Sequence, residues 1–301
     1  MLSRRNVRVK LMQVLYATSR QQQDARHARS LFQKMAKDSF RLYLLHLLTV
    51  QRVAEYAKID EATRKAKLRP TAADKAFTAR LAHNPLTASL TGNGTLSDYY
   101  GRNAITGMID ADRIQVLYRS FSQTEGYRAY LDAEQPDHLS TLLTLYKWLQ
   151  KQDLFTTMVE DQFPLWNEDK SLVMGAMKKT LKSLPAEQEG FFLAYENDRE
   201  AVDEFGKALL NFLYSADAQL TDRITKVLQN WDAERVAAID MILLKLAVGE
   251  FLHFPNIPPT VTLNEYVDIS KLYSTPNSKA FINGVLDRLL KQFQGEGLVA
   301  E

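Results

Sequence analysis

The sequence predicts an all-α fold. Apolar side chains recur at helical spacing in nearly every segment, and no region alternates between strand and helix patterns. The chain has 301 residues, of which 46% are hydrophobic, so it can form one large or two ordinary domains with a substantial core. No apolar run approaches the roughly 18 residues of a membrane span, and no small-residue cleavage site follows the basic N-terminus. We therefore expect a globular, cytoplasmic protein.

The first part of the chain contains one clear amphipathic helix followed by less regular patterns. Val7, Leu11, Val14 and Leu15 form an apolar stripe that predicts a helix over residues 4–22. Proline and glycine interrupt residues 61–110, for which we expect loop and weak helix. Further helices are predicted over residues 38–60, 112–131, 138–153 and 154–182.

The C-terminal part carries sharper helix signals. Helices are predicted over residues 200–214, 217–229 and 233–253, and the last of them must end before Pro255, because proline disfavours helical geometry in the residue that precedes it. Thr262 and Glu265 have the spacing of a capping box, in which each side chain bonds the backbone amide of the other residue. We expect a helix to begin there.

The Asn283-Gly284 pair would usually indicate a hairpin, but its surroundings are helical. Thr275 is the expected N-cap of a closing helix and Pro276 its first residue. A glycine inside a helix costs about 1 kcal/mol relative to alanine. Gly284 therefore indicates either close packing against another helix or a surface that a ligand approaches. The apolar stripe of this helix comprises Ile282, Val285, Leu286, Leu289, Leu290 and Phe293.

The sequence lacks the motifs of common enzymes. It contains no GxGxxG, P-loop, GxSxG or HExxH motif, and it has no cysteine. The histidines are scattered, and the carboxylate pairs lie on polar helical faces, where solvated charge explains them. We expect no catalytic residue, no metal site and no cofactor. The alternative is a catalytic constellation that only folding brings together.

Charge is distributed unevenly along the chain. Residues 1–80 contain 18 Lys+Arg and 6 Asp+Glu, a net charge of +12, whereas residues 81–301 contain 20 and 30, a net charge of −10. The N-terminal excess is either a solvated basic face or a binding surface for polyanions.

Two stretches resemble the NusB family of bacterial transcription antitermination factors. The first is the arginine-rich start RRNVRVKLMQVLY, and the second is RVAAIDMILLKLAVGEFL followed by NIPPTVTLNEYVDISKLYSTPNSKAFINGVLD. The resemblance implies two packed helical bundles, here with an additional inserted helical region. It divides the chain into an arginine-rich arm with the first helix (1–25), an expanded helical region (26–195) and a C-terminal NusB-like bundle (196–301).

The resemblance also implies a function. Family members bind the boxA element of single-stranded leader RNA together with the ribosomal small-subunit protein NusE. That complex joins elongating RNA polymerase, usually on ribosomal RNA operons. A regulatory RNA-binding factor with no reaction of its own is thus expected, and whether it also forms a homodimer is left open.

Single-stranded RNA is held by cations on its phosphates and by flat side chains stacked on its bases. The RNA-binding candidates that follow from the resemblance are Arg4, Arg5, Arg8, Lys10, Tyr16, Ser278, Lys279, Phe281 and Asn283. Tyr16 and Phe281 are the candidates for stacking, and a place in the core is the alternative for each. Asn277 stands where family members more often have an acidic residue, a change that favours RNA if it has any effect.

The candidates for binding a protein partner are Asp240, Lys245 and Glu250 in the helix predicted over residues 233–253. The apolar stripe of this helix should face the core, so we expect its charged side chains to point elsewhere. An ordinary solvated carboxylate is the alternative for Asp240. The stripe comprises Val236, Ile239, Leu243, Leu246 and Ala247.

Two other functions compete with this interpretation. Similar domains precede RNA cytosine methyltransferases, but that chemistry needs a cysteine and an α/β cofactor domain, and the sequence shows neither. The second alternative is a helical protein-protein adaptor that has lost RNA binding. The middle region could replace partner contacts, extend RNA binding through Lys65, Lys67 and Arg69, or only add stability.

Overall fold

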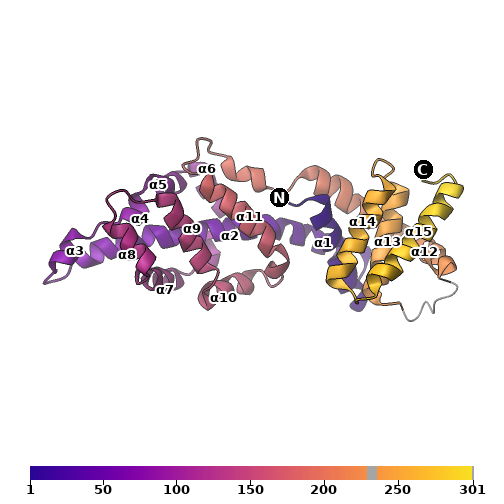
Figure 1. The fold of residues 1–301 in the computed structure, drawn as a ribbon, viewed down its shortest axis with the longest axis horizontal. Coiled ribbons are helices and arrows are strands. Elements are labelled where there is room, and N and C mark those ends of the chain that lie inside the picture. The colour runs from indigo at the N-terminus through magenta and orange to yellow at the C-terminus, as the bar shows by residue number, and fades with distance from the viewer. Residues whose placement is uncertain (229–235, 300–301) are drawn as a thin grey trace. The chain divides into compact units, whose positions relative to one another are not determined.

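The computed structural model describes residues 1–228 and 236–299, and the chain divides into two compact units. Unit 1 contains Met1 and residues 38–196, and unit 2 contains residues 2–37 and 197–301. The described residues form helices and no strands, which confirms the all-α prediction (Figure 1). The predicted helical positions 229 and 233–235 lie outside the described residues. The three-part division made from the sequence stays a prediction.

Unit 1 is built around the later part of α2 (Ala25–Lys65), whose buried apolar side chains between Phe40 and Ala57 belong to one hydrophobic core. Residues 61–110, expected to be loop and weak helix, contain several short helices. Predicted helices 112–131 and 154–182 are each divided in two, and Thr124 caps the helix that follows the first break. The remaining helices are α3 (Ala72–Ala76), α4 (Arg80–His83), α5 (Pro85–Thr91), α6 (Gly94–Arg102), α7 (Ala111–Ser122), α8 (Glu125–Asp132), α9 (His138–Leu149), α10 (Asp153–Gln162) and α11 (Trp166–Lys182), with 3-10 turns at Thr106–Met108 and Phe191–Tyr195.

Unit 2 has α13 (Ala238–His253) at its centre. This helix packs against α1 (Arg4–Arg20), α12 (Ala208–Val227), α14 (Pro259–Tyr273) and α15 (Ser278–Gly295). Gly249 allows α12 to come close, because a Cβ atom there would lie 2.8 Å from the Leu213 side chain. A π-helix, Glu200–Lys207, runs directly into α12, so the helices predicted over residues 200–214 and 217–229 are continuous.

Three predicted helix starts are wrong. The helix α2 begins at residue 25 and not at 38. The helix α14 begins at Pro259, so Thr262 lies inside it, where its buried hydroxyl donates to Glu250 instead of capping. The helix α15 begins at Ser278 after Asn277, and not at Pro276. In the last two cases the hydroxyl group that was expected to cap the helix makes another hydrogen bond. The Thr262 hydroxyl bonds to Glu250 of α13, and the Thr275 hydroxyl bonds to that of Ser278 within the turn.

Candidate nucleic-acid interface

Arg8 and Glu250 form a buried ion pair that joins α1 to α13. The Arg8 Nε atom donates to Glu250 Oε2 at 2.9 Å, and a terminal nitrogen donates to Oε1 at 2.5 Å. The exposed fractions of the two side chains are 4% and 0%. Thr262 and Tyr266 of α14 donate their hydroxyls to the same carboxylate at 2.7 and 3.0 Å. One carboxylate therefore holds three helices together.

Arg8 keeps its charge in the folded protein. Burial by itself would lower the pKa of Arg8, but the hydrogen bonds that Arg8 donates to Glu250 and the nearby carboxylates raise it above its ordinary value. Burial, reinforced by the Glu250 charge, raises the pKa of Tyr266 well above its ordinary value. Tyr266 thus stays protonated and remains a hydrogen-bond donor to Glu250.

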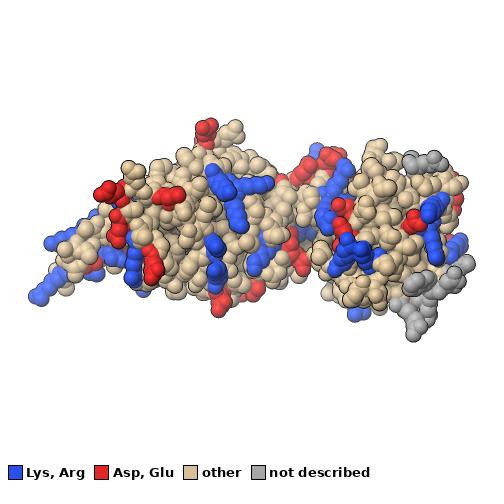
Figure 2. Space-filling model, in the orientation of Figure 1, with Lys and Arg blue, Asp and Glu red and all other residues tan. Residues whose placement is uncertain are grey.

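Arg4 and Arg5 are accessible cations in the first turn of α1. Their side chains are 45% and 44% exposed, and Arg4 pairs with Glu200 at 2.5 Å. Arg5 lies 3.6 Å from Glu265 and 3.7 Å from Asp268 on α14, distances too long for strong hydrogen bonds. Figure 2 shows basic side chains around α1 and α14 with acidic ones among them. An incoming phosphate would compete with these carboxylates for Arg5.

The other α1 candidates differ in exposure. Lys10 is buried, with only 5% of the residue exposed, whereas Tyr16 is 37% exposed and has Arg20 beside its ring at 5.7 Å. Tyr16 is therefore available for stacking, and its alternative role in the core is excluded. Lys10 cannot broaden a positive surface in this conformation.

Asp240 and Ser278 are both buried, and they connect α13 to the start of α15. Ser278 donates its hydroxyl to Asp240 Oδ2 at 2.7 Å, and Ser274 donates to Oδ1 at 2.5 Å. The expectation that the charged side chains of this helix point away from the core is wrong for Asp240 and Glu250. The helix α13 is surrounded by four others, so residues outside the apolar stripe are also covered.

The first half of α15 presents a groove of about 470 Å³, lined by Asn277, Ala280, Phe281, Gly284, Val285 and Arg288. A Cβ atom on Gly284 would meet no described atom within 4 Å, so close packing against the first helix does not explain this glycine. Lys279 and Asn283 are exposed beside the groove, and Phe281 is partly exposed. A flat group entering the groove would meet an aromatic side chain and a cation, Arg288.

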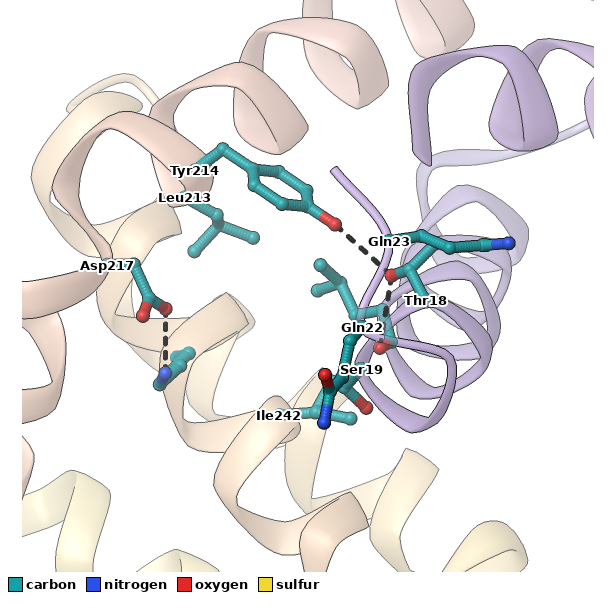
Figure 3. Close-up of a pocket in the computed structure, with 10 residues that line it drawn as sticks. Thr18, Ser19, Gln22, Gln23, Leu213, Tyr214, Asp217 and Ile242 are labelled. Atoms are coloured by element: carbon teal, nitrogen blue, oxygen red, sulfur yellow. Dashed lines mark hydrogen bonds and ion pairs between the residues drawn. The ribbon is translucent and has the colours of Figure 1, made fainter. Parts of the chain in front are cut away.

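Lys245 lies at a second pocket, of about 310 Å³, between α1, α12 and α13 (Figure 3). Its ammonium group pairs with Asp217 at 2.7 Å. Tyr214 lies across the pocket from Gln22, with its hydroxyl 3.1 Å from that of Thr18. Lys245 is thus the one of the three predicted partner-binding residues that borders an accessible cavity, among the residues that the structure describes.

The predicted RNA-binding residues all belong to unit 2, but they form two groups. Arg4, Arg5, Tyr16, Lys279, Phe281 and Asn283 reach the surface at least in part, whereas Arg8, Lys10 and Ser278 are buried. Sequence reasoning missed Glu265 and Asp268, which face Arg5, and Arg288, which lines the groove. The spacing of Phe281, Gly284 and Arg288 along one helical face could have revealed the last of these.

Comparison with known proteins identifies the family. The family model described as "NusB family" matches residues 167–291. The transcription antitermination protein NusB of Enterococcus faecalis is 39% identical over 115 residues, which cover 35% of this chain and 74% of that protein. The chain belongs to the NusB family.

Other NusB proteins match a similar share of the chain. The transcription antitermination protein NusB of Desulforapulum autotrophicum is 36% identical over 110 residues, covering 36% of this chain and 77% of that protein. The corresponding protein of Chloroherpeton thalassium is 32% identical over 124 residues, and only 59% of its length is covered. No solved structure matches the chain.

Membership in the NusB family confirms the prediction of a non-enzymatic protein, because these relatives are named for transcription antitermination and not for a reaction. None of the helices that the structure describes has both the length and the hydropathy needed to cross a membrane. Within residues 1–228 and 236–299, no cluster of three or more His, Asp or Glu side chains could hold a metal ion.

Proposed function

We propose that this NusB-family protein is an RNA-binding transcription antitermination factor of the cytoplasm. It binds boxA-type single-stranded leader RNA together with the ribosomal protein NusE and joins the elongating RNA polymerase complex on ribosomal RNA operons. The names of its relatives support the antitermination part of this proposal. The RNA part is carried by one observation: Arg5 of α1 lies against α14, which packs on and leads into the grooved helix α15.

The accessible candidates supply the two interactions that a single strand needs. Arg4, Arg5 and Lys279 bind phosphates, and three or four such contacts predict a slope of roughly −2 to −3 in log affinity against log salt. Tyr16 and Phe281 stack on bases, and Asn283 hydrogen-bonds to base edges or phosphate.

The buried candidates position these groups without touching RNA in the conformation described. Arg8 orients α1 through Glu250, and Ser278 fixes the start of α15 through Asp240. Lys245, at the pocket between α1, α12 and α13, is the accessible candidate for contact with NusE. The second function, a protein adaptor without RNA binding, is favoured by the ion pairs that occupy Arg4 and Arg5.

Fluorescence anisotropy with a boxA-like RNA, with and without NusE and at two salt concentrations, tests the proposal. Phe281→Ala should weaken binding by roughly 5- to 150-fold, the equivalent of about 1 to 3 kcal/mol for a lost stacking contact. Arg5→Glu should weaken binding and make the salt slope shallower by about 0.7. Arg26→Glu is the matched control, because Arg26 is exposed and pairs with nearby Asp24. RNA affinity that is absent, or unchanged in both test variants, would refute RNA binding, and a retained NusE complex would then favour the adaptor.

A further inference from the structure

Two stretches of unit 1, each built on one helix, contain lysines and no acidic residue. Residues 138–152 and 170–186, which include α9 and most of α11, contain six lysines and no Asp or Glu. Residues 38–196 as a whole contain 19 Lys+Arg and 20 Asp+Glu, so unit 1 has almost no net charge. The positive charge of these two segments is therefore local, and it is balanced by acidic residues elsewhere in the unit.

The two helices pack against each other and expose five of these lysines. The buried side chains of α9 and α11, among them Leu142, Tyr146, Val173 and Met177, point into the core. Figure 2 shows basic side chains over α9 and α11 on the face in view. The exposed lysines, which we call the lysine face, are Lys147, Lys151, Lys178, Lys179 and Lys182.

The lysine face is not neutralised within the described part of the chain. None of its five ammonium groups forms an ion pair with a described carboxylate. The basic residues near the end of α2 differ in this respect, because Lys65 pairs with Glu61 and Lys67 pairs with Asp74. The positive potential at α9 and α11 is correspondingly available to an external anion.

The chemistry of the face fits a phosphate backbone. Lysine is a flexible point charge that contacts phosphates without reading bases, so it contributes affinity that does not depend on sequence. Gly175 lies one turn before Lys178 and Lys179, and a Cβ atom there would meet no described atom within 4 Å. Position 175 therefore places no side chain between these lysines and an approaching polymer backbone.

We propose that the lysine face binds the phosphates of RNA that flanks the segment held by unit 2, without sequence preference. The choice of RNA over an acidic protein rests on the proposed function, because a transcript bound by unit 2 brings its own flanking nucleotides to high effective concentration. Unit 1 then increases the affinity for long transcripts over short ones.

The test compares the full chain with a variant carrying Lys178→Gln, Lys179→Gln and Lys182→Gln. The probes are a boxA-like RNA of about 12 nucleotides and the same RNA extended by about 20 uridines. The extended RNA should bind roughly tenfold more tightly to the unaltered chain at low salt. The variant should lose this gain, keep its affinity for the short RNA, and show a salt slope for the extended RNA that is shallower by about 2.

Two controls make the result specific. A variant with Lys58→Gln, Lys75→Gln and Arg128→Gln removes the same charge from exposed positions of unit 1 and should keep the gain. Replacing Lys178, Lys179 and Lys182 by arginine should also keep it, because the charge is retained. The proposal would be overturned if the first control lost as much affinity for the extended RNA as the test variant. It would also be overturned if the test variant lost as much affinity for the short RNA as for the extended RNA.

The proposed function and the lysine face fail in distinguishable ways. If the unaltered chain does not bind the short RNA, the proposed function fails, and binding of the uridine segment alone then tests the lysine face. Loss of that binding in the glutamine variant supports the face, and no loss overturns it. A further outcome is that the chain binds polyglutamate through these lysines but binds the extended RNA no more tightly than the short one. This outcome would assign the surface to an acidic protein and would also overturn the proposal.

Discussion

Replacing Arg8 by methionine should destabilise unit 2 strongly and independently of RNA. Methionine retains most of the aliphatic volume but leaves the Glu250 carboxylate buried without its counter-ion. Removing one partner of a buried ion pair typically costs about 3 to 5 kcal/mol. Thr262 and Tyr266 still donate to Glu250, so part of the carboxylate's hydrogen bonding remains. We therefore expect a loss of about 3 kcal/mol in the free energy of unfolding at neutral pH.

A second substitution separates this electrostatic effect from lost packing. In the variant Arg8→Met with Glu250→Gln, the neutral amide accepts from one of the Thr262 and Tyr266 hydroxyls through its oxygen and donates to the other through its nitrogen. The double variant should recover more than half of the lost stability, because no uncompensated charge remains. Arg4→Met, at an exposed ion pair, should change stability by less than about 1 kcal/mol.

Urea unfolding followed by circular dichroism measures these differences, and peptide-level hydrogen exchange assigns the transition to unit 2. The reasoning is refuted if Arg8→Met costs less than about 1 kcal/mol, or if the double variant is no more stable than the single one. Either result would mean that the pair with Glu250 is not what holds α1 to α13. Arg8 would then again be a candidate for direct contact with RNA.

Two further predictions concern a glycine and a buried histidine. Gly284→Ala should raise the free energy of unfolding by up to about 1 kcal/mol, because alanine favours helix and its methyl group meets no described atom. The same change should weaken RNA binding by narrowing the groove, and a gain in stability with unchanged RNA affinity would contradict our account of the glycine. Burial, with a contribution from Lys170, lowers the pKa of His46 from 6.5 to about 3. A depressed folded-state pKa means that the unfolded chain takes up a proton first as pH falls, so stability should drop by about 2 kcal/mol between pH 7 and 5. His46→Gln should lack this part of the pH dependence in thermal or urea unfolding, and an unchanged pH profile would show that His46 is not the group responsible.

The helical spacing of apolar residues was sufficient to predict the fold class and the position of α1. Proline geometry predicted that a helix ends before Pro255, as α13 does at His253. These features depend on the period of the apolar residues and on the position of a proline, and both can be identified directly in a sequence. The sequence left Tyr16 open between stacking and the core, and its exposure on α1 decides against the core.

Sequence reasoning failed where a side chain makes its hydrogen bond with a residue far away in the sequence. Thr262 fits a capping box, but Glu250 accepts its hydrogen bond from twelve positions earlier in the chain. Glu250 in turn was expected at the surface, because one apolar stripe was assumed to be the only buried face of α13. The run MILLKLAVGEF, which is apolar on nearly all sides, is typical of a helix enclosed by others and is the signal that could have corrected this.

The wide separation of Arg8 and Glu250 affects how the protein can be made. The two residues are 242 positions apart, so at about 5 to 20 residues per second a ribosome needs roughly 10 to 50 s to synthesise the second after the first. During that interval the nascent α1 has apolar side chains and an arginine but no α13 to cover them. Residues 38–196, by contrast, form one uninterrupted stretch and can fold while α13 is still being translated.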